Sequence, residues 1–230
     1  MILYEDAYIL ALYKPNNMLV HHSYMAKNQA EEMTLLESFQ QKYQRKVFPL
    51  HRLDRKTSGL VLCAKDTTYV ATFQQLFTSS TIEKVYYGLV RGFTPKQGEI
   101  NSPVKGRDAN VYKEAFTFYK TLQCVSLSIP VPPYETSRYS LIAMIPKTGR
   151  MHQLRIHMNK INHPLIGDPK YGDRFHNRMF QTNFEIDTLF LHAASLVFTH
   201  PYSQKQIEIK CPFPQHWQDI AKKFNWTLPS

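Results

Sequence analysis

The stretch HRLDRKTSGL, residues 51–60, holds a single carboxylate among cations just ahead of an apolar run. Asp54 lies between Arg52 and Arg55, and the run LVLCA, residues 60–64, predicts a buried strand because it is short, apolar and bounded by turn-forming and charged residues. Side chains at such a junction between a loop and a rigid element often carry function. An Asp beside two Arg residues is also typical of a surface salt bridge, and both alternatives stay open at this point.

The chemistry available to Asp54 depends on what surrounds it. If the motif faces a cleft, the neighbouring guanidinium groups would hold the carboxylate ionised and lower its pKa by about 1–3 units. An ionised carboxylate suits a nucleophile or a base but not a general acid. Ser58 lacks the GxSxG context of a hydrolase nucleophile, so the Thr-Ser-Gly sequence at residues 57–59 is interpreted as a turn.

The overall composition is that of a basic globular chain. Its 230 residues, 43% of them hydrophobic, suffice for one core, and we expect a single domain over residues 1–230. The 28 Lys and Arg residues outnumber the 18 Asp and Glu residues and give a net charge of +10, which favours a polyanionic partner such as nucleic acid. A basic protein without such a partner is the alternative that composition leaves open.

Cysteine usage and the first residues of the chain predict a cytoplasmic protein. Cys63, Cys124 and Cys211 are scattered, odd in number and without a CxxC pair, so neither a disulfide framework nor a zinc site is expected. Glu5 and Asp6 stand where a signal peptide would carry positive charge, and the apolar run around them is too short to span a bilayer. We therefore expect no membrane contact.

The sequence lacks the usual motifs for a metal or a cofactor. It contains 10 His residues, but none of them forms an HxxxH pair or joins a Cys-rich set. Neither GxGxxG nor GxxxxGK[ST] occurs, so nucleotide-cofactor binding has no support. We expect neither a metal nor a cofactor.

The hydrophobic spacing predicts strands and helices that do not alternate regularly. Strands are expected at residues 8–13, 18–20, 60–64, 82–93, 137–146, 188–200 and 206–213, the first two joined by a turn at 14–17. Helices are expected at residues 34–44, after a cap at Asp66, within 148–162 and at 217–224. Hairpin material is expected within residues 100–119 and a proline-rich loop at 130–135. Because strands outnumber helices, the predicted class is α+β with a largely antiparallel sheet.

Arg155 is the second candidate for function. The spacing of Met151, Leu154, Met158 and Ile161 predicts the core-facing side of a helix, and Arg155 falls at the edge of that side. A half-buried Arg needs a partner for its charge. The alternative is that its aliphatic stem covers the core while the guanidinium stays in water.

Two other places could contact a phosphate or a base. Gly149 and Arg150 precede the same helix and would offer exposed backbone N–H groups and a cation, which suits a phosphate as well as simple packing. Tyr86 and Tyr87 lie within a predicted strand, where alternation sends one to each face. One of them could stack on a base, although aromatic residues are also ordinary strand residues.

Four stretches taken together resemble the RluA family of RNA pseudouridine synthases. They cover most of the chain in order and are HRLDRKTSGL (51–60), EKVYYGLVRG (83–92), GRMHQLRIHM (149–158) and HPLIGDPKYG (163–172). The resemblance implies the fold of that family, which is α+β with a mostly antiparallel mixed sheet, flanking helices and loops, and a central RNA-binding cleft. Departures are small: Cys63 and Met151 stand where Leu or Ile is frequent, and residues 100–130 match no motif.

The resemblance also implies which residues carry the reaction. Asp54 matches the essential aspartate of the family, Arg155 the arginine that pairs with it, and Tyr86 the tyrosine that packs on the target base. Leu154 would supply the apolar surface on the other side of the base. Arg52 corresponds to the residue that enters the helix stack as the uridine leaves it.

RNA is the partner that the resemblance implies. Arg55, Arg150 and His152 are expected to bind it, and no cofactor or metal is required. The segments PPYETSRYSLIAMIPKTGR and HPLIGDPKYGDRFHNR, with no separate N-terminal RNA-binding module, are most similar to the TruC-type branch, which converts uridine 65 of tRNA. Ribosomal RNA as the target and a non-catalytic RNA-binding protein are the alternatives, and a monomer is expected.

Overall fold

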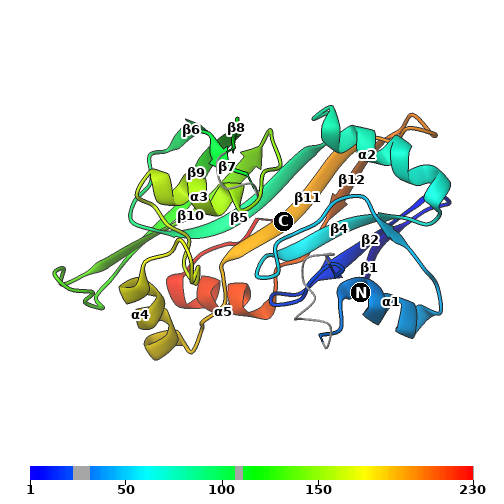
Figure 1. Ribbon diagram of the computed structural model, residues 1–230. Coiled ribbons are helices and arrows are strands. Elements are labelled where there is room, and N and C mark those ends of the chain that lie inside the picture. Colours follow the sequence, from blue (N-terminus) through cyan, green and yellow to red (C-terminus); the bar gives the residue numbers. More distant parts are fainter. Residues whose placement is uncertain (23–31, 107–110, 230) are drawn as a thin grey trace. The chain divides into compact units, whose positions relative to one another are not determined.

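The computed structural model describes residues 1–22, 32–106 and 111–229, and in it the chain packs into two compact units (Figure 1). Unit 1 consists of Met1–Lys84 and Ala193–Pro212, and unit 2 consists of Val85–His192 and Phe213–Ser230. The chain therefore leaves unit 1, returns to it once and ends in unit 2. A single catalytic domain over residues 1–230 stays a prediction.

Unit 1 is built on a sheet with the order β1-β2-β4-β11, with β12 beside β11 and β3 beside β4. The pairings β1–β2, β2–β4, β3–β4 and β11–β12 are antiparallel. Its elements are β1 (Ile2–Glu5), β2 (Ile9–Lys14), α1 (Leu35–Tyr43), β3 (Phe48–Pro49), β4 (Ser58–Ala64), a 3₁₀ turn (Thr67–Tyr69), α2 (Val70–Thr78), β11 (Leu191–Thr199, which begins in unit 2) and β12 (Gln206–Lys210).

Strand β4 forms the centre of unit 1, since all of its residues are buried. Leu60 and Leu62 pack with Phe73 of α2 in one apolar cluster, and α1 and α2 lie on either side of these strands in Figure 1. Helix α1 begins as predicted, because Thr34 and Glu37 form a reciprocal capping box. The strand and both helices of this region were thus predictable from local spacing.

The first 20 residues differ from the prediction. The hairpin turn lies at residues 6–8, where the Asp6 carboxylate accepts the backbone N–H groups of Tyr8 and Ile9 at 2.7 and 2.9 Å. Residues 18–20 form no strand. The carbonyl groups of Leu19 and Val20 instead accept hydrogen bonds from the first turn of α1. The segment expected to be a second strand therefore supplies carbonyl oxygens to the N–H groups at the start of α1, which have no partner within the helix.

Unit 2 is built on a sheet with the order β5-β10-β9-β6, and every pairing in it is antiparallel. Strands β7 and β8 form a separate antiparallel pair. Its elements are β5 (Glu83–Arg91, which begins in unit 1), β6 (Gln97–Asn101), β7 (Val104–Lys105), β8 (Tyr112–Lys113), β9 (Phe116–Leu127), β10 (Ser137–Pro146), α3 (Gln153–Lys160), α4 (Arg174–Phe184) and α5 (Gln215–Phe224). The hairpin expected within residues 100–119 is present, although residues 107–110 lie outside the described ranges.

The sheet of unit 2 is covered on both faces. Leu141 of β10 packs with Phe180 of α4 and Trp217 of α5, whereas its neighbour Ile142 packs with Leu154 of α3. Adjacent strand residues point to opposite faces, so α4 and α5 cover one face and α3 covers the other, as Figure 1 also shows. Helix α4 was not predicted, although Asp173 caps it by accepting two backbone N–H groups.

Helix α3 is shorter than the sequence predicts. Met151 precedes it and is 45% exposed, and Ile161 lies beyond its end. The cause is His152, which adopts a left-handed backbone conformation with φ 56° and so prevents Met151 from joining the helix.

The predicted class, α+β with a mostly antiparallel sheet, is confirmed.

Gly59 fixes the close approach of β4 and β11 within unit 1. Its φ is +123°, and a Cβ at this position would lie 2.2 Å from the carbonyl oxygen of Ala193. Ser58 and Gly59 already belong to β4, so the expected Thr-Ser-Gly turn is a strand start that needs a residue without a side chain.

We expect Gly59→Ala to lower the free energy of unfolding by at least about 3 kcal/mol, because it combines a disfavoured φ with a backbone overlap. Urea denaturation measures this loss. Gly149→Ala is the matched control, because a Cβ there meets no atom within 4 Å. Equal stabilities of the two variants would contradict the role given to Gly59.

Candidate active site

The loop that carries Asp54 is anchored by His51. The Nε2 atom of His51 accepts the backbone N–H of Leu62 in β4 at 2.9 Å, and its ring stacks on Phe77 of α2 with 4.7 Å between centroids. An acceptor at Nε2 requires a neutral ring with its proton on Nδ1. Burial lowers the pKa of His51 to about 3, and the charge of Lys84 acts in the same direction. The ring is therefore neutral at physiological pH and fixes the loop on the sheet.

Asp54 opens a tight turn directly before β4. The backbone N–H of Thr57 donates to the carbonyl oxygen of Asp54 at 3.0 Å. The Asp54 side chain is half-buried, and Leu53 beside it is buried. The carboxylate thus lies on a loop that the buried Leu53 anchors to the protein. Functional groups are often held on loops that a rigid scaffold positions in this way.

Lys14 ties this turn to the end of β2 from inside unit 1. Its side chain is fully buried, and Nζ donates to the carbonyl oxygens of Pro15, Met18 and Arg55 at 2.8, 2.8 and 3.0 Å. Burial lowers the pKa of Lys14 to about 7, while the negative charge of Asp54 acts in the opposite direction. The buried ammonium therefore joins two loops and lies within the electrostatic influence of the carboxylate.

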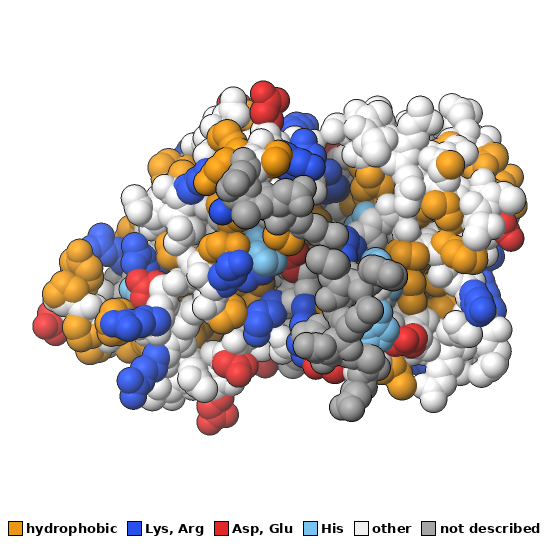
Figure 2. Space-filling view, in the orientation of Figure 1, with side chains coloured by type: hydrophobic (Ala, Val, Ile, Leu, Met, Phe, Trp, Pro, Cys, Tyr) orange, Lys and Arg blue, Asp and Glu red, His pale blue; other side chains and the backbone are white. Residues whose placement is uncertain are grey.

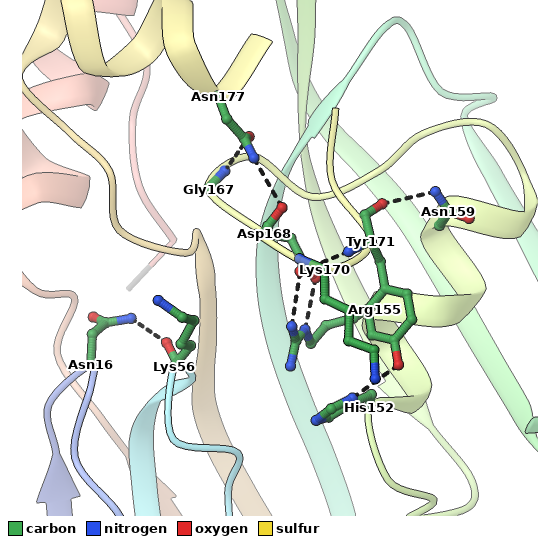
Figure 3. A network of polar contacts seen from close by, with 10 residues as sticks. All are labelled: Asn16, Lys56, His152, Arg155, Asn159, Gly167, Asp168, Lys170, Tyr171 and Asn177. Carbon is green, nitrogen blue, oxygen red and sulfur yellow. Dashed lines mark hydrogen bonds and ion pairs between the residues drawn. The ribbon is translucent and has the colours of Figure 1, made fainter. Parts of the chain in front are cut away.

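A second contact reinforces the same connection. The Asn16 side-chain amide donates to the carbonyl oxygen of Lys56 at 2.6 Å (Figure 3). Together with Lys14, it holds the turn at Asp54 against residues 15–18, which the sequence analysis interpreted only as a turn between two strands.

The two arginines that flank Asp54 differ in their surroundings. Arg52 is exposed and lies close enough to His21 to lower the pKa of that ring, after the larger effect of burial. Arg55 pairs with Glu32 at 2.7 Å and donates to the carbonyl oxygen of Asn17 at 3.3 Å. Arg55 therefore has another carboxylate as a partner, and this exposed pair contributes at most about 1 kcal/mol.

Tyr86 and Tyr87 point to opposite faces of the sheet in unit 2, as the alternation predicted. Tyr87 packs in the cluster under α4 and α5, with its ring centroid 5.2 Å from that of Phe213. Tyr86 packs against the cluster that contains Leu154 of α3 and Met144, its partner on β10. The structure thus brings Tyr86 and Leu154 to the same face.

A polar frame fixes the start of α3. The Gln153 side chain accepts the N–H of Arg150 at 3.0 Å and donates to Thr117 of β9 at 3.0 Å. His157, one turn later, binds the Thr117 hydroxyl through Nδ1 and the Ser102 carbonyl through Nε2, both at 2.9 Å. Gln153 and His157 therefore share the face toward β9, and this explains their spacing in GRMHQLRIHM.

The expected phosphate site at Gly149 and Arg150 needs a correction. The backbone N–H of Arg150 is already bound by Gln153, so it is not an exposed donor for an anion. The Arg150 side chain is exposed and donates through Nε to the carbonyl oxygen of Glu114 at 3.0 Å. A contact of Arg150 with RNA would therefore involve its guanidinium group.

Arg155 is buried and has a partner, so the alternative in which it only covers the core is wrong. Its Nε and Nη2 donate to the two carboxylate oxygens of Asp168 at 2.7 and 2.8 Å (Figure 3). The side chains are 6% and 1% exposed. The guanidinium carbon lies 5.2 Å from the centroid of the Tyr171 ring, and the Tyr171 hydroxyl lies 3.1 Å from Nδ1 of His152.

Asp168 and Tyr171 are the residues that sequence reasoning missed. Both belong to HPLIGDPKYG, which contributed to the resemblance, but neither received a role. The usable signal was Arg155 itself, because a buried guanidinium needs a carboxylate and Asp168 is the acidic residue of the next stretch that carried the resemblance.

The surface of unit 2 near α3 and α4 is basic. Figure 2 shows Lys and Arg side chains over the part of the visible face that holds these helices. The exposed cations of these helices and of the loops beside them are Lys147, Arg150, Lys160, Lys170, Arg174 and Arg178. Among the residues that the structure describes, no group of three or more His, Cys, Asp or Glu side chains could hold a metal ion. No helix in the described ranges has the length and apolar character of a membrane span.

Comparison with known proteins identifies the family. The sequence model of the RNA pseudouridylate synthase family matches residues 8–160. The chain belongs to this family. It is therefore an RNA pseudouridine synthase, an isomerase that converts uridine in RNA to pseudouridine.

Full-length relatives and solved structures agree with this family. The chain is 38% identical to a tRNA pseudouridine synthase C of Pasteurella multocida, over 100% of this chain and 98% of the relative. It is 39% identical to the protein of that name in Haemophilus ducreyi, over 98% and 96% of the two chains. Human RNA pseudouridylate synthase domain containing 4 superimposes with a TM-score of 0.74 at 22% identity, over 100% of this chain and 94% of that one, and shares the pseudouridine synthase fold.

Placed in this synthase, the expected site residues fall into two groups. Asp54, Arg52 and Arg55 lie in unit 1. The second group consists of Tyr86, Leu154, Arg155, Arg150 and His152, and it lies in unit 2. Within each group the members lie on one loop or around one helix, but their catalytic and RNA-binding roles stay predictions.

We expect the Lys14→Met variant of this synthase to lose a distinctive pH dependence of stability. In the wild type the unfolded chain binds a proton at Lys14 up to about pH 10.5, the ordinary value, whereas the folded chain releases it near pH 7. Between these values the unfolded state binds more protons, so the free energy of unfolding rises with pH through this window.

Urea denaturation of both proteins at pH 6, 7, 8 and 9 measures the effect. The stability of the wild type relative to Lys14→Met should change little from pH 6 to 7 and increase from pH 7 to 9. Parallel pH dependences would show that Lys14 titrates alike in both states.

Proposed function

We propose that this chain converts a specific uridine of tRNA to pseudouridine, with uridine 65 as the target. The support comes from the full-length relatives, which are 36–39% identical, carry the name tRNA pseudouridine synthase C and align over nearly the whole of both chains. The observation that carries the proposal is that the match spans nearly the whole chain, so that it includes the stretches holding Asp54, Tyr86 and Arg155.

The reaction needs a positioned carboxylate and nothing supplied from outside. The N1–C1′ bond of uridine breaks, the uracil turns over while it stays bound, and C5 joins C1′ as the C5 hydrogen leaves as a proton and N1 gains one. In this proposal Asp54 is the ionised group near the ribose. It either attacks C1′ as a nucleophile or removes the C2′ proton as a base. Both steps balance without an oxidant or a reductant.

Tyr86 and Leu154 are suited to hold the uracil. They pack at the same face of unit 2, and Leu154 is next in sequence to Arg155. We assign Tyr86 to one side of the base and Leu154 to the other, with the Arg155 guanidinium paired to Asp54. A flat base between an aromatic ring and an apolar side chain can turn over without losing its contacts.

The target nucleotide must leave its stack before the reaction. Extruding a base costs a few kcal/mol, which contacts in the pocket and the neutralisation of phosphates offset. Arg52, which is exposed, is assigned to the gap that the uridine leaves. Arg55, Arg150 and His152 are assigned to the RNA around it, and the net charge of +10 supports such backbone contacts.

The surroundings of Asp54 also argue against the non-catalytic RNA-binding protein that the sequence left open. Asp54 is half-buried and lies within the electrostatic influence of Lys14, and its loop is fixed by His51. A protein that only binds RNA gains nothing from a carboxylate at this place, since the negative charge repels phosphate.

Asp54→Ala is expected to lower the rate of pseudouridine formation by at least about 1,000-fold, because the proposed reaction loses its nucleophile or base. RNA affinity in a filter-binding assay should be unchanged or slightly tighter, since a negative charge is lost. Asp187→Ala removes the same charge from an exposed position and serves as the matched control. Normal conversion by Asp54→Ala would exclude the role proposed for Asp54.

Release of tritium from C5 of uridine tests the substrate. RNA labelled at C5 loses the label to water only when C5 becomes bonded to C1′. We expect release from tRNA and none from ribosomal RNA, and a uridine-to-cytidine change at position 65 of the tRNA should abolish it. Release from ribosomal RNA alone would replace tRNA as the substrate, and binding of tRNA without release would contradict the proposed target.

A further inference from the structure

The segment that carries Asp168 is built to hold its carboxylate in one place. Besides the two contacts with Arg155, Oδ1 accepts the backbone N–H groups of Lys170 and Tyr171 at 2.9 and 3.0 Å. The carbonyl oxygen of Asp168 accepts the side-chain amide of Asn177, on α4, at 2.9 Å (Figure 3). Asp168 is thus bound through both its side chain and its backbone.

Gly167 places Asp168 at this position. Its φ is +76°, and a Cβ there would lie 2.1 Å from the carbonyl oxygen of Thr188. The backbone N–H of Gly167 donates to Oδ1 of Asn177 at 2.8 Å, so the same amide side chain holds the residues on both sides of the Gly167–Asp168 peptide. The backbone conformation of Gly167 therefore allows the Asp168 carboxylate to reach Arg155 of α3.

The charge of this pair is fixed as well as its geometry. Burial alone would raise the pKa of Asp168, but the hydrogen bonds and charge of Arg155, followed by the N–H groups of Tyr171 and Lys170, lower it below its ordinary value. Asp168 is therefore ionised, and its contact with Arg155 is a charge-assisted fork with two parallel hydrogen bonds. Such a fork fixes both the plane and the direction of the guanidinium, which Lys in place of Arg could not provide.

Stability alone is a weak reason for this arrangement. Burying two charges costs several kcal/mol of solvation, and apolar residues of similar volume are often equally stabilising. The pair lies next to Leu154, which packs in the cluster that includes Tyr86. Its position beside the residues assigned to the uracil points to a function for the fixed guanidinium.

We propose that Asp168 is a positioning residue of the reaction, which acts by holding Arg155 in the orientation that catalysis requires. The Tyr171 ring contacts the guanidinium from another side, and His152 contacts the Tyr171 hydroxyl. The inference rests on the proposed function, because it takes Arg155 as the residue that acts on the catalytic carboxylate.

Asp168→Asn tests the proposal, since it keeps the shape of the side chain but places an N–H₂ or a neutral oxygen opposite the two guanidinium donors. We expect kcat for tRNA to fall on the order of 100-fold, as for a displacement of a reacting group by about 1 Å, with KM for tRNA unchanged. Asp173→Asn is the matched control. Asp173 also pairs with an arginine of unit 2, Arg91, and Asn can still cap α4.

A double-mutant comparison separates positioning from a general structural role. In Arg155→Lys the fork is already lost, so adding Asp168→Asn should lower kcat by less than threefold, about one-thirtieth of its effect in the wild type. A merely structural role predicts that the two effects multiply. Thermal denaturation of each variant shows whether it is folded at the assay temperature.

Asp168→Glu covers the case in which Asp168→Asn does not fold. It keeps the negative charge and moves the carboxylate by one methylene, and we expect kcat to fall about tenfold with KM unchanged. A kcat within threefold of the wild type in either folded variant would overturn the proposal. Failure of the proposed function gives a different result, since the wild type itself would then release no tritium from tRNA.

Discussion

The buried ion pair between Arg155 and Asp168 imposes the strictest constraint on unit 2. A charge removed from water must be matched by an opposite charge and by hydrogen bonds, or its solvation loss destabilises the fold. Both side chains meet this condition, because the carboxylate also receives two backbone N–H groups. The segment around Gly167, the start of α4 and the position of Arg155 on α3 are therefore mutually dependent.

Unit 1 uses the same principle with a different group. The ammonium of Lys14 lies inside the protein and binds three carbonyl oxygens from two loops, one of them in the turn at Asp54. A carbonyl oxygen that cannot reach water or a ladder partner needs such a donor. In each unit a buried basic side chain, Lys14 or Arg155, thus binds segments that are distant in sequence. Apolar clusters pack around these contacts.

Features set by local spacing could be predicted from the sequence, and features set by distant residues could not. The capping box of α1 and the opposite faces of Tyr86 and Tyr87 follow from neighbouring residues. The start of α3 after Met151, later than the pattern predicts, follows from a left-handed backbone at His152, and the next residue, Gln153, binds Thr117 of β9. The carboxylate partner of Arg155 lies 13 positions along the chain, beyond any helical or strand period. Residue types therefore indicated candidates for the reacting groups, but not the groups that hold those candidates in place.

The alternation in β5 limits how this chain can vary. Tyr86 and Tyr87 serve two different apolar clusters, and β5 pairs with β10 residue by residue from Tyr86 to Arg91. Loss or gain of a single residue between Tyr87 and Gly92 would force one side of that ladder to slip, which exchanges the inward and outward sets. Length changes in this enzyme should therefore accumulate in the connections between strands, and β5 should keep a constant number of residues across its relatives.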